Sequence, residues 1–326
     1  MRITKKMVRE LLEVLDEIVE EIRQEEKEKY PYAEWEQKRE IVKKRLRKLP
    51  EYVREAVAMI RIQKRVGRPK KVVLEKRVML FLFARLMNKS NRDVEELLEL
   101  FEPLFGIKVS YKTIERLYSD EEVKMALHNL FILLLREEGV SGDFSGDGSG
   151  YSLTITKHYR SSPKKKGKDF RYVFRIIDID TGMYVGFGYS SRSERDAFEK
   201  AMKMLKEMGI KINSISLDKY YSSRKTLRMF DAETAVYVIP KKNLARIGFD
   251  WLRVIERIVE APYRFLKRYF KRNLSEAGFS ADKRRFGWVV RQRREDRREI
   301  ALFAIGVVAQ HICGEGGEVI LSQSRF

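Results

Sequence analysis

The stretch "RYVFRIIDIDTGMYVGFGYSS", from Arg171 to Ser191, decides the fold that we expect for this chain. Both of its halves are rich in β-branched and aromatic residues, which favour strands. Between the halves, Asp180, Thr181 and Gly182 form a short sequence that is typical of a turn. The stretch therefore predicts a β-hairpin, and we place its two arms as the second and third strands of a sheet.

The flanking sequence predicts the rest of this sheet and the helices that would cover it. Alternating or apolar stretches predict further strands at Tyr151–Tyr159, Lys211–Tyr221 and Thr234–Lys242. Other stretches predict helices at Ser193–Gly209, Ser222–Phe230, Trp251–Arg285 and Arg294–Ile312. The order is strand, strand, strand, helix, strand, helix, strand, helix. That order predicts a ribonuclease-H-like α/β core with a mixed five-stranded sheet flanked by helices.

The chain ahead of this core is expected to be all-α. In the first sixty residues apolar side chains recur at three- and four-residue steps, which is the period of a helix. A second helix is expected to run from Ala33 to Leu49 and to stop at Pro50, because proline breaks the hydrogen bonding of a helix. Packing on the same protein, a dimer contact and a DNA contact all remain open for this part.

The segment from Ser90 to Asp120 predicts a helix-turn-helix. Ser90 and Ser110 are good N-caps for two short helices, and Gly106 lies in the turn between them. The second helix would present four residues outward: Tyr111, Lys112, Glu115 and Arg116. Because the second helix of this motif enters the major groove, we expect Lys112 and Arg116 to contact DNA. Many helical hairpins share the pattern without touching DNA.

Basic residues exceed acidic ones along the whole chain. The 326 residues include 68 Lys+Arg and 48 Asp+Glu, which gives a formal net charge of +20. Such an excess indicates a polyanionic partner, most often nucleic acid. The stretch "KRVGRPKK" (Lys64–Lys71) stays extended around Pro69 and resembles an AT-hook core, so we expect Arg68 to contact DNA. A plain basic linker is the equal alternative.

Cysteine, histidine and hydropathy patterns exclude several other classes of protein. The single Cys313 excludes an internal disulfide framework and suits a reducing cytoplasm, and the three histidines lack the spacing of a zinc site. The apolar run Met79–Met87 is too short to span a bilayer and contains Arg85. We expect a soluble intracellular protein without a membrane partner, and its high charge favours a heat-adapted source.

Three acidic residues stand where an α/β domain of this order would place catalysis. Asp147 lies in a Gly-rich run beside the first strand, Asp218 comes just after an apolar strand, and Glu276 lies on a late helix. Considered separately, Asp147 is typical of a turn residue, Asp218 of a helix cap and Glu276 of a solvated helix residue. Brought together, three carboxylates repel one another unless cations lie between them, so the set suits two Mg²⁺ or Mn²⁺ ions. Asp143 is the alternative first aspartate.

Short motifs around these acids resemble those of a known family. Four residues are spaced as Y-x₂-R-x₃-E-x₆-K: Tyr269, Arg272, Glu276 and Lys283. This pattern resembles the Y-R-E-K signature of DDE transposases of the insertion-sequence-four type. "DGSG" at Asp147 and "LDKYYSS" around Asp218 are similar to the family's D-G-T-G and D-x-x-Y-x-S motifs, with Ser149 in place of threonine. The resemblance runs from Gly67 to the C-terminus.

The resemblance implies the roles of the site residues. Asp147, Asp218 and Glu276 would hold two metal ions and catalyse strand cleavage and 3′-hydroxyl strand transfer. A second set would contact DNA phosphates near the cut: Tyr269, Arg272 and Lys283. Gly278 interrupts the helix between Glu276 and Lys283 and weakens the expectation that the two share a face.

The sequence as a whole predicts four parts, and the resemblance implies a biological role. The expected parts are a helical region at 1–63, a basic linker at 64–71, a helix-turn-helix-like region at 72–138, and a catalytic domain at 139–326 with a short helical insertion near 244–258. The protein would bind terminal inverted repeats of a prokaryotic mobile element as a homodimer and associate with the nucleoid. The alternatives are a non-catalytic DNA-binding descendant of a transposase and a ribonuclease-H-like nuclease.

Overall fold

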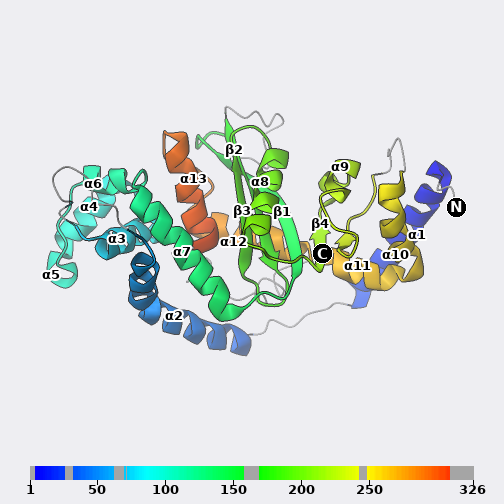
Figure 1. Ribbon diagram of the computed structural model, residues 1–326, viewed down its shortest axis with the longest axis horizontal. Helices are drawn as coiled ribbons and strands as arrows, with labels where there is room; N and C mark the ends of the chain where they lie inside the picture. Colours follow the sequence, from blue (N-terminus) through cyan, green and yellow to red (C-terminus); the bar gives the residue numbers. More distant parts are fainter. Residues whose placement is uncertain are drawn as a thin grey trace.

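The computed structural model describes residues 4–25, 32–61, 70, 72–157, 169–241 and 248–308. Helices make up the described elements that precede the sheet (Figure 1): α1 (Lys5–Glu25), α2 (Tyr32–Ala58), α3 (Leu74–Leu86), α4 (Asn91–Leu100), α5 (Glu102–Phe105), α6 (Tyr111–Leu117) and α7 (Glu121–Glu138). Arg68 and Cys313 lie outside the described residues, as does most of the basic linker.

The sheet has five strands in the order β3-β2-β1-β4-β5. The strands are β1 (Asp143–Ser152), β2 (Phe170–Asp178), β3 (Tyr184–Ser190), β4 (Ser214–Leu217) and β5 (Ala235–Tyr237). Strand β2 is antiparallel to β1 and β3, whereas β4 is parallel to β1 and β5. The prediction of an α/β core with a mixed five-stranded sheet is therefore confirmed, and so is the hairpin of β2 and β3.

The remaining elements cover this sheet and follow it in the chain. They are α8 (Glu194–Glu207), η1 (Lys219–Tyr221), α9 (Arg224–Leu227), η2 (Phe249–Trp251), α10 (Leu252–Glu260), α11 (Pro262–Phe270), α12 (Asn273–Phe286), α13 (Glu295–Phe303) and the π-helical turn η3 (Ala304–Val308). Helix α8 packs on β2 and β3, α11 packs on β4 and β5, and α12 packs on β1 and β2. In Figure 1, α8 lies in front of the sheet and α12 behind it.

The first strand differs from its expected position. It spans 143–152, so Asp147 lies inside β1 rather than beside it, and the expected strand at Tyr151–Tyr159 overlaps it only at its start. Glycine and serine have low strand propensity, but β1 is paired on both sides. The glycines also let neighbours approach, because a Cβ at Gly146 would lie 2.8 Å from the Phe174 ring. Packing overrides propensity here.

Two helix boundaries also differ from the expectation. Pro50 does not end α2, which continues to Ala58, because the turn after the proline buries Val53 and Ala56 completely and α2 packs on α7. The single long helix expected after Trp251 is divided into α10, α11 and α12, and Pro262 starts the second of these at a position where proline costs little. The described part of the insertion predicted near 244–258 consists of η2 and most of α10.

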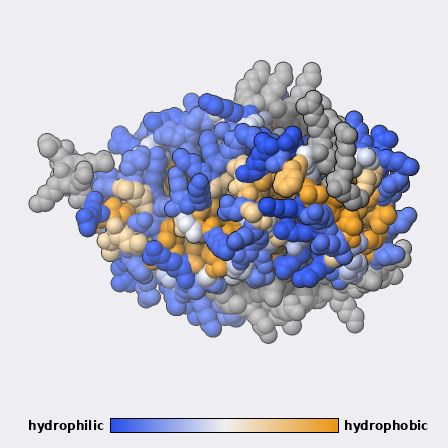
Figure 2. All heavy atoms as spheres, turned by 45° about the vertical axis from the view of Figure 1, so that its right-hand side comes forward, coloured by the Kyte–Doolittle hydropathy of each residue, from blue (hydrophilic) through white to orange (hydrophobic). Residues whose placement is uncertain are grey.

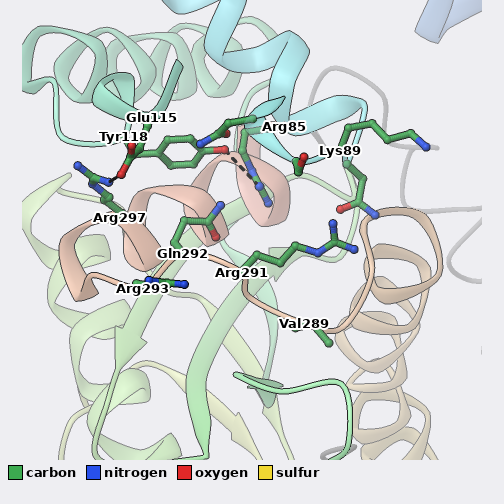
Figure 3. Close-up of a pocket in the computed structure, with 12 residues that line it drawn as sticks. Arg85, Lys89, Glu115, Tyr118, Val289, Arg291, Gln292, Arg293 and Arg297 are labelled. Carbon is green, nitrogen blue, oxygen red and sulfur yellow. Dashed lines mark hydrogen bonds and ion pairs between the residues drawn. The ribbon is translucent and has the colours of Figure 1, made fainter. Parts of the chain in front are cut away.

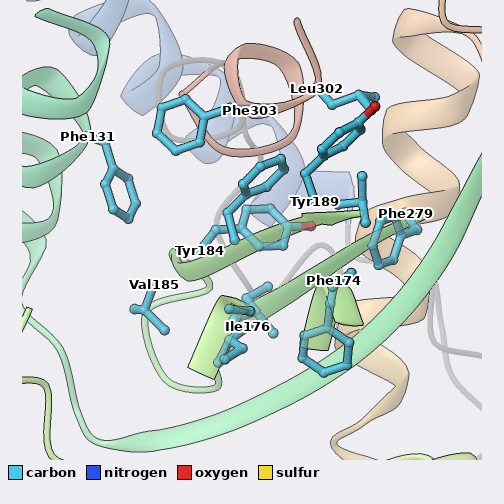
Figure 4. Packing of buried hydrophobic residues seen from close by; sticks show 14 of the residues in the cluster. Phe131, Phe174, Ile176, Tyr184, Val185, Tyr189, Phe279, Leu302 and Phe303 are labelled. Atoms are coloured by element: carbon cyan, nitrogen blue, oxygen red, sulfur yellow. The ribbon is translucent and has the colours of Figure 1, made fainter. Parts of the chain in front are cut away.

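The preceding helices and the sheet share one hydrophobic core (Figure 4). Phe303 of α13 packs edge-on against Phe131 of α7, with ring centroids 5.8 Å apart, and against Phe187 of β3 at 5.4 Å. All three side chains are buried. Helix α13 therefore lies between α7 and the sheet and joins them into one packed body, as Figure 1 also shows.

Hydrophilic residues cover most of the face drawn in Figure 2, and apolar residues gather in a band across it. Large apolar side chains that are exposed on the described surface include Leu100, Ile155 and Phe249. Among the described helices, none combines the length and the apolar character that a membrane span requires.

A partly buried network of ion pairs holds α3 to the start of α7. Lys70 donates hydrogen bonds to Asp120 at 3.0 Å and to Glu122 at 2.8 Å, and Arg77 bonds to the same two carboxylates. The hydrogen bonds from Lys70 and Arg77 lower the pKa of Glu122 from 4.5 to about 2. A carboxylate with a lowered pKa in the folded state stabilises the fold above its unfolded pKa, and this contribution disappears as the pH falls.

We expect Glu122→Gln to lower the free energy of unfolding at neutral pH by up to about 3 kcal/mol, since each pKa unit corresponds to about 1.4 kcal/mol. The difference from the wild-type protein should shrink as the pH falls from about 4.5 to about 2. Urea denaturation at a series of pH values measures it. Glu121→Gln is the matched control, because the Glu121 side chain is 63% exposed. A difference that stays constant with pH would contradict this prediction.

Candidate active site

The register of the sheet brings the two predicted aspartates together. Gly146 of β1 pairs with Leu217 of β4, and β4 ends at that residue. The next residues, Asp147 and Asp218, therefore lie side by side at neighbouring strand positions, and neighbouring strands are about 4.8 Å apart in a sheet. Beyond this point β1 continues without β4 beside it, so the Asp218 side chain emerges where the parallel strand stops.

Helix α12 brings the third acid to the same place. Residues 145, 147 and 149 share one face of β1, because side chains alternate along a strand. Ser145 hydrogen-bonds Ser275 of α12 at 2.8 Å, and Ser149 accepts a hydrogen bond from Lys283 at 2.6 Å. The eight residues of helix between those contacts span about 12 Å, close to the roughly 13 Å between the two serines along the strand. Helix α12 thus lies along β1, and Glu276 faces the site.

A glycine lets α12 approach the sheet this closely. A Cβ at Gly278 would lie 1.9 Å from the hydroxyl oxygen of Tyr184 on β3. The helix continues through Gly278 without a break and keeps Lys283 in its last turn. The glycine that weakened the expectation of a continuous helix face is therefore required by the packing of α12.

The electrostatics of Asp147 show that the acids act on one another. Burial raises the pKa of Asp147 well above its usual value, and the negative charge of Glu276 raises it further. Glu194 and Asp218 add smaller effects in the same direction, while a hydrogen bond from the Gly148 backbone opposes them. Asp147 thus interacts with three other carboxyl groups, and we call these four residues the acidic cluster.

Arg272 partly neutralises this cluster. Its Nη1 lies 3.3 Å from Oδ2 of Asp218 and is also bonded to Oε1 of Glu276. Its guanidinium carbon stands 5.3 Å from the centroid of the Tyr269 ring. The other oxygen of Asp218, Oδ1, accepts a hydrogen bond of 2.7 Å from the Tyr220 backbone and caps η1. Asp218 is therefore a helix cap and a member of the cluster at once.

The side chains supply the donor atoms that Mg²⁺ and Mn²⁺ prefer, because all of them are carboxylate oxygens. As they stand, no three His, Cys, Asp or Glu side chains in the described parts of the chain are arranged to hold a metal ion. The Arg272 guanidinium lies between Asp218 and Glu276 instead. The donor set fits the two cations in chemical type, and ligation requires that guanidinium to move aside.

The two possible first aspartates have different surroundings. Asp143, at the start of β1, accepts a hydrogen bond from Ser214 and lies 3.6 Å from Arg268. The charges that raise the pKa of Asp147 are those of Glu276, Glu194 and Asp218. The structure thus brings Asp147, and not Asp143, together with the other two acids.

The residues expected to contact DNA at this site are already engaged. The Tyr269 side chain is buried, at 5% exposure. Lys283 donates to Ser149 and, at 2.9 Å, to the Gly150 carbonyl, and its ammonium lies 4.9 Å from the centre of the Tyr151 ring. These contacts fix α12 against β1. Contact of Tyr269, Arg272 and Lys283 with DNA stays a prediction.

The expected DNA-reading helix, α6, presents two of its cations to solvent. Lys112 and Arg116 are exposed, whereas Glu115 bonds to Arg297 of α13. Ser90 caps α4 through a complete capping box, as expected. Ser110 precedes α6 but makes no capping bond to its backbone, and its hydroxyl lies 3.3 Å from that of Thr113. Arg68 cannot be placed, because it lies outside the described residues.

Sequence reasoning missed Glu194 as a member of the cluster. Glu194 opens α8, and a Cβ at Gly148 would lie 2.4 Å from its Oε1. It also accepts a hydrogen bond of 3.3 Å from the buried Tyr221 hydroxyl. In the sequence Glu194 follows the N-cap Ser193, where acidic residues are common, so no signal distinguished it.

Comparison with known proteins adds one strong match. No protein-family model matches the chain, and no solved structure matches it. A protein of Archaeoglobus fulgidus named "Probable transposase for insertion sequence element ISA1214" is 89% identical to it over 306 residues. The match covers 94% of this chain and 95% of the relative. Identity this high over nearly the full length of both chains shows common membership, so the chain belongs to the transposases of insertion sequence elements.

Proposed function

We propose that the protein is a DDE transposase of the insertion-sequence-four type, which binds the terminal inverted repeats of its element and acts as a homodimer. The observation that carries this proposal is the clustering of Asp147, Asp218 and Glu276, which are far apart in the sequence. The Y-R-E-K spacing and the identity to a relative named as a transposase support it. The parts at 1–63, 64–71, 72–138 and 139–326 would bind and cut DNA together.

The sheet supports a ribonuclease-H-like assignment of the catalytic domain. Three antiparallel strands, β1 to β3, are followed by two parallel ones, and β1 lies in the centre of the order β3-β2-β1-β4-β5. The first acid lies within the central strand, the second follows β4, and the third lies on a late helix. Each acid thus comes from a different rigid element, which favours a site held in fixed geometry.

Asp147, Asp218 and Glu276 would hold two Mg²⁺ or Mn²⁺ ions. When bound, such ions activate the attacking water or 3′-hydroxyl and stabilise the leaving oxygen of a phosphoryl transfer. The chain's own residues position these acids: β1 and β4 hold the aspartates side by side, and α12 carries Glu276 along β1.

Arg272 would change partners during the reaction. In the free protein it neutralises Asp218 and Glu276. Its planar guanidinium would instead bind a phosphate of the DNA strand through two hydrogen bonds, while Asp218 and Glu276 would be left free to hold the cations. Tyr269 would orient it through the ring on which it rests. Arg68, Lys112 and Arg116 would bind DNA outside the site.

The test uses the full-length protein, a labelled duplex that ends in the element's terminal repeat, and a supercoiled target plasmid. We expect cleavage at the repeat and joining of the labelled 3′ end to the plasmid with Mg²⁺ or Mn²⁺, and neither product with excess chelator. Cleavage without joining would instead identify a ribonuclease-H-like nuclease. Repeat binding without cleavage in either metal would identify a non-catalytic DNA-binding protein.

A further inference from the structure

A cationic cavity of about 270 Å³ lies where the helices before the sheet meet the chain that leads into α13. The end of α3, the start of α4 and the end of α6 form one side, and residues 289–293 form the other (Figure 3). Its lining includes four basic side chains that have no ion-pair partner among the described residues: Arg85, Lys89, Arg291 and Arg293. None of the residues assigned above to metal or DNA binding lines it.

The charge of this cavity is not neutralised from within. Glu115 is the carboxylate of the lining, and it is held by Arg297 at 2.5 Å and by Lys112 at 3.0 Å. Asp93, whose pKa is lowered mainly by its bonds to Ser90 and less by the charges of Lys89 and Arg291, is committed to the capping box of α4. The described residues thus leave a concentrated positive charge, which favours an anion.

One arginine also presents a donor that lacks a partner. The Nε atom of Arg85 is buried without a hydrogen bond in the described structure, and its Nη1 reaches the Tyr118 hydroxyl only at 3.5 Å. Figure 3 shows Arg85 extending from α3 into the space above Arg291. A buried donor without an acceptor is costly, so the site favours a ligand with several acceptor oxygens. A phosphate group has the required number and charge.

The floor of the cavity is fixed to the catalytic strand. The Val290 backbone donates to the Ser152 carbonyl at 2.9 Å, and the Ser152 backbone donates to the Trp288 carbonyl at 3.0 Å. Ser152 is the last residue of β1, five positions after Asp147, which is about 17 Å along a strand. Successive phosphates of one strand rise about 3.4 Å along the axis of a DNA duplex, so this separation corresponds to about five nucleotides for a duplex that lies parallel to β1.

We propose that this cavity binds a backbone phosphate of the double-stranded DNA on which the protein acts, about five nucleotides from the phosphodiester bond that is cut beside Asp147. The proposal rests on the proposed function, because that function supplies the DNA. A phosphate held here would fix the distance between the DNA read by the helices and the strand that is cut, since residues 288–290 are hydrogen-bonded to β1.

The experiment compares two double variants of the full-length protein in DNA binding at a series of salt concentrations. Arg291→Ala with Arg293→Ala removes two cations of the cavity, and Lys203→Ala with Lys206→Ala removes two from α8, which covers the front of the sheet. We expect the cavity variant to bind the repeat duplex about tenfold more weakly at low salt. The slope of the logarithm of its binding constant against the logarithm of the salt concentration should fall in magnitude by about 0.9 for each phosphate that the variant no longer neutralises. The control variant should keep the wild-type affinity and slope.

Phosphate ethylation interference then locates the bound phosphate. In the wild-type complex, ethylation about five nucleotides from the cleaved bond should block binding, and in the cavity variant this interference should disappear. Equal slopes in wild type and cavity variant, or equally weakened binding in both variants, would overturn the proposal and leave the cleavage function standing. A third result would also overturn the proposal: inorganic phosphate stabilises the wild-type protein but not the cavity variant, while the salt dependence of DNA binding is the same for both. That result would identify a site for a small anion. If the wild-type protein does not bind the duplex, the proposed function and this inference both fail.

Discussion

Asp147→Asn is expected to reduce Mg²⁺-dependent cleavage of the repeat duplex by at least about a thousandfold, while binding of the duplex is retained. Asparagine keeps the size of the side chain but removes the charge, and a metal-ion contribution of several kcal/mol to the transition state corresponds to a change of this order. Asp218→Asn and Glu276→Gln should cause losses of similar size. Because the three acids act as a unit, combining two of the substitutions should cost little more than one.

Asp143→Asn is the matched control for this result. It makes the same chemical change four residues earlier on the same face of β1, where the carboxylate bonds Ser214 and lies 3.6 Å from Arg268. We expect cleavage by this variant to stay within about tenfold of the wild-type rate. Cleavage should be measured under single-turnover conditions, and circular dichroism should show that each variant is folded. Full cleavage by Asp147→Asn would refute the proposed site. Loss of cleavage in Asp143→Asn alone would identify Asp143 as the first aspartate instead.

Asp282→Asn is expected to lower the free energy of unfolding by about 3–5 kcal/mol, which corresponds to a fall in Tm of about 10 °C. Asp282 of α12 and Arg175 of β2 form an ion pair whose side chains are both 0% exposed. Burial raises the pKa of Asp282 to about 6, and the Arg175 charge opposes that shift. The substitution removes the countercharge and leaves a buried guanidinium unpaired.

The double variant Arg175→Met with Asp282→Leu separates loss of the pair from loss of packing. In the wild-type protein Arg175 Nε, Arg175 Nη2 and Asp282 Oδ1 lack hydrogen-bond partners among the described residues, so the pair is imperfectly compensated. We expect the double variant to be at least as stable as the wild type within about 1 kcal/mol. Asp180→Asn, in an exposed turn, is the control and should change little. A double variant less stable than Asp282→Asn would contradict this account.

The sheet could be predicted because its signals are local, whereas the grouping of the three acids was expected from the order of the elements and from short motifs that resemble those of a known family. The strand pattern around the Asp180 turn specifies a hairpin. Lys283, the last residue of the Y-R-E-K spacing, ties α12 to β1, whereas Tyr269, the first, lies on the preceding helix α11. The first strand could not be placed from propensity, because its glycines and serines are selected by the close approach of Phe174 and Glu194. Such contacts are invisible to local periodicity.

Long-range pairs explain the remaining failures. Arg175 and Asp282 are 107 residues apart, and nothing near either residue indicates the other. Glu194 joins the cluster because α8 starts beside Gly148, which depends on how β3 is placed. Arg272 bonds Glu276 four residues further along the chain, a spacing that is visible in the sequence, but its second contact with Asp218 depends on the end of β4. Tertiary structure alone creates that contact.

The edge-on packing of Phe131 and Phe187 on Phe303 has a consequence for protein engineering. A chimera made by cutting at residue 138 and grafting the front half of a relative would replace Phe131, the ring that packs on Phe303 from before the cut. Under the proposed function, new target recognition is better introduced by redesigning the exposed Lys112 and Arg116 of α6 and leaving this aromatic contact intact. Recognition and cutting would then evolve by point changes within one body rather than by exchange of modules.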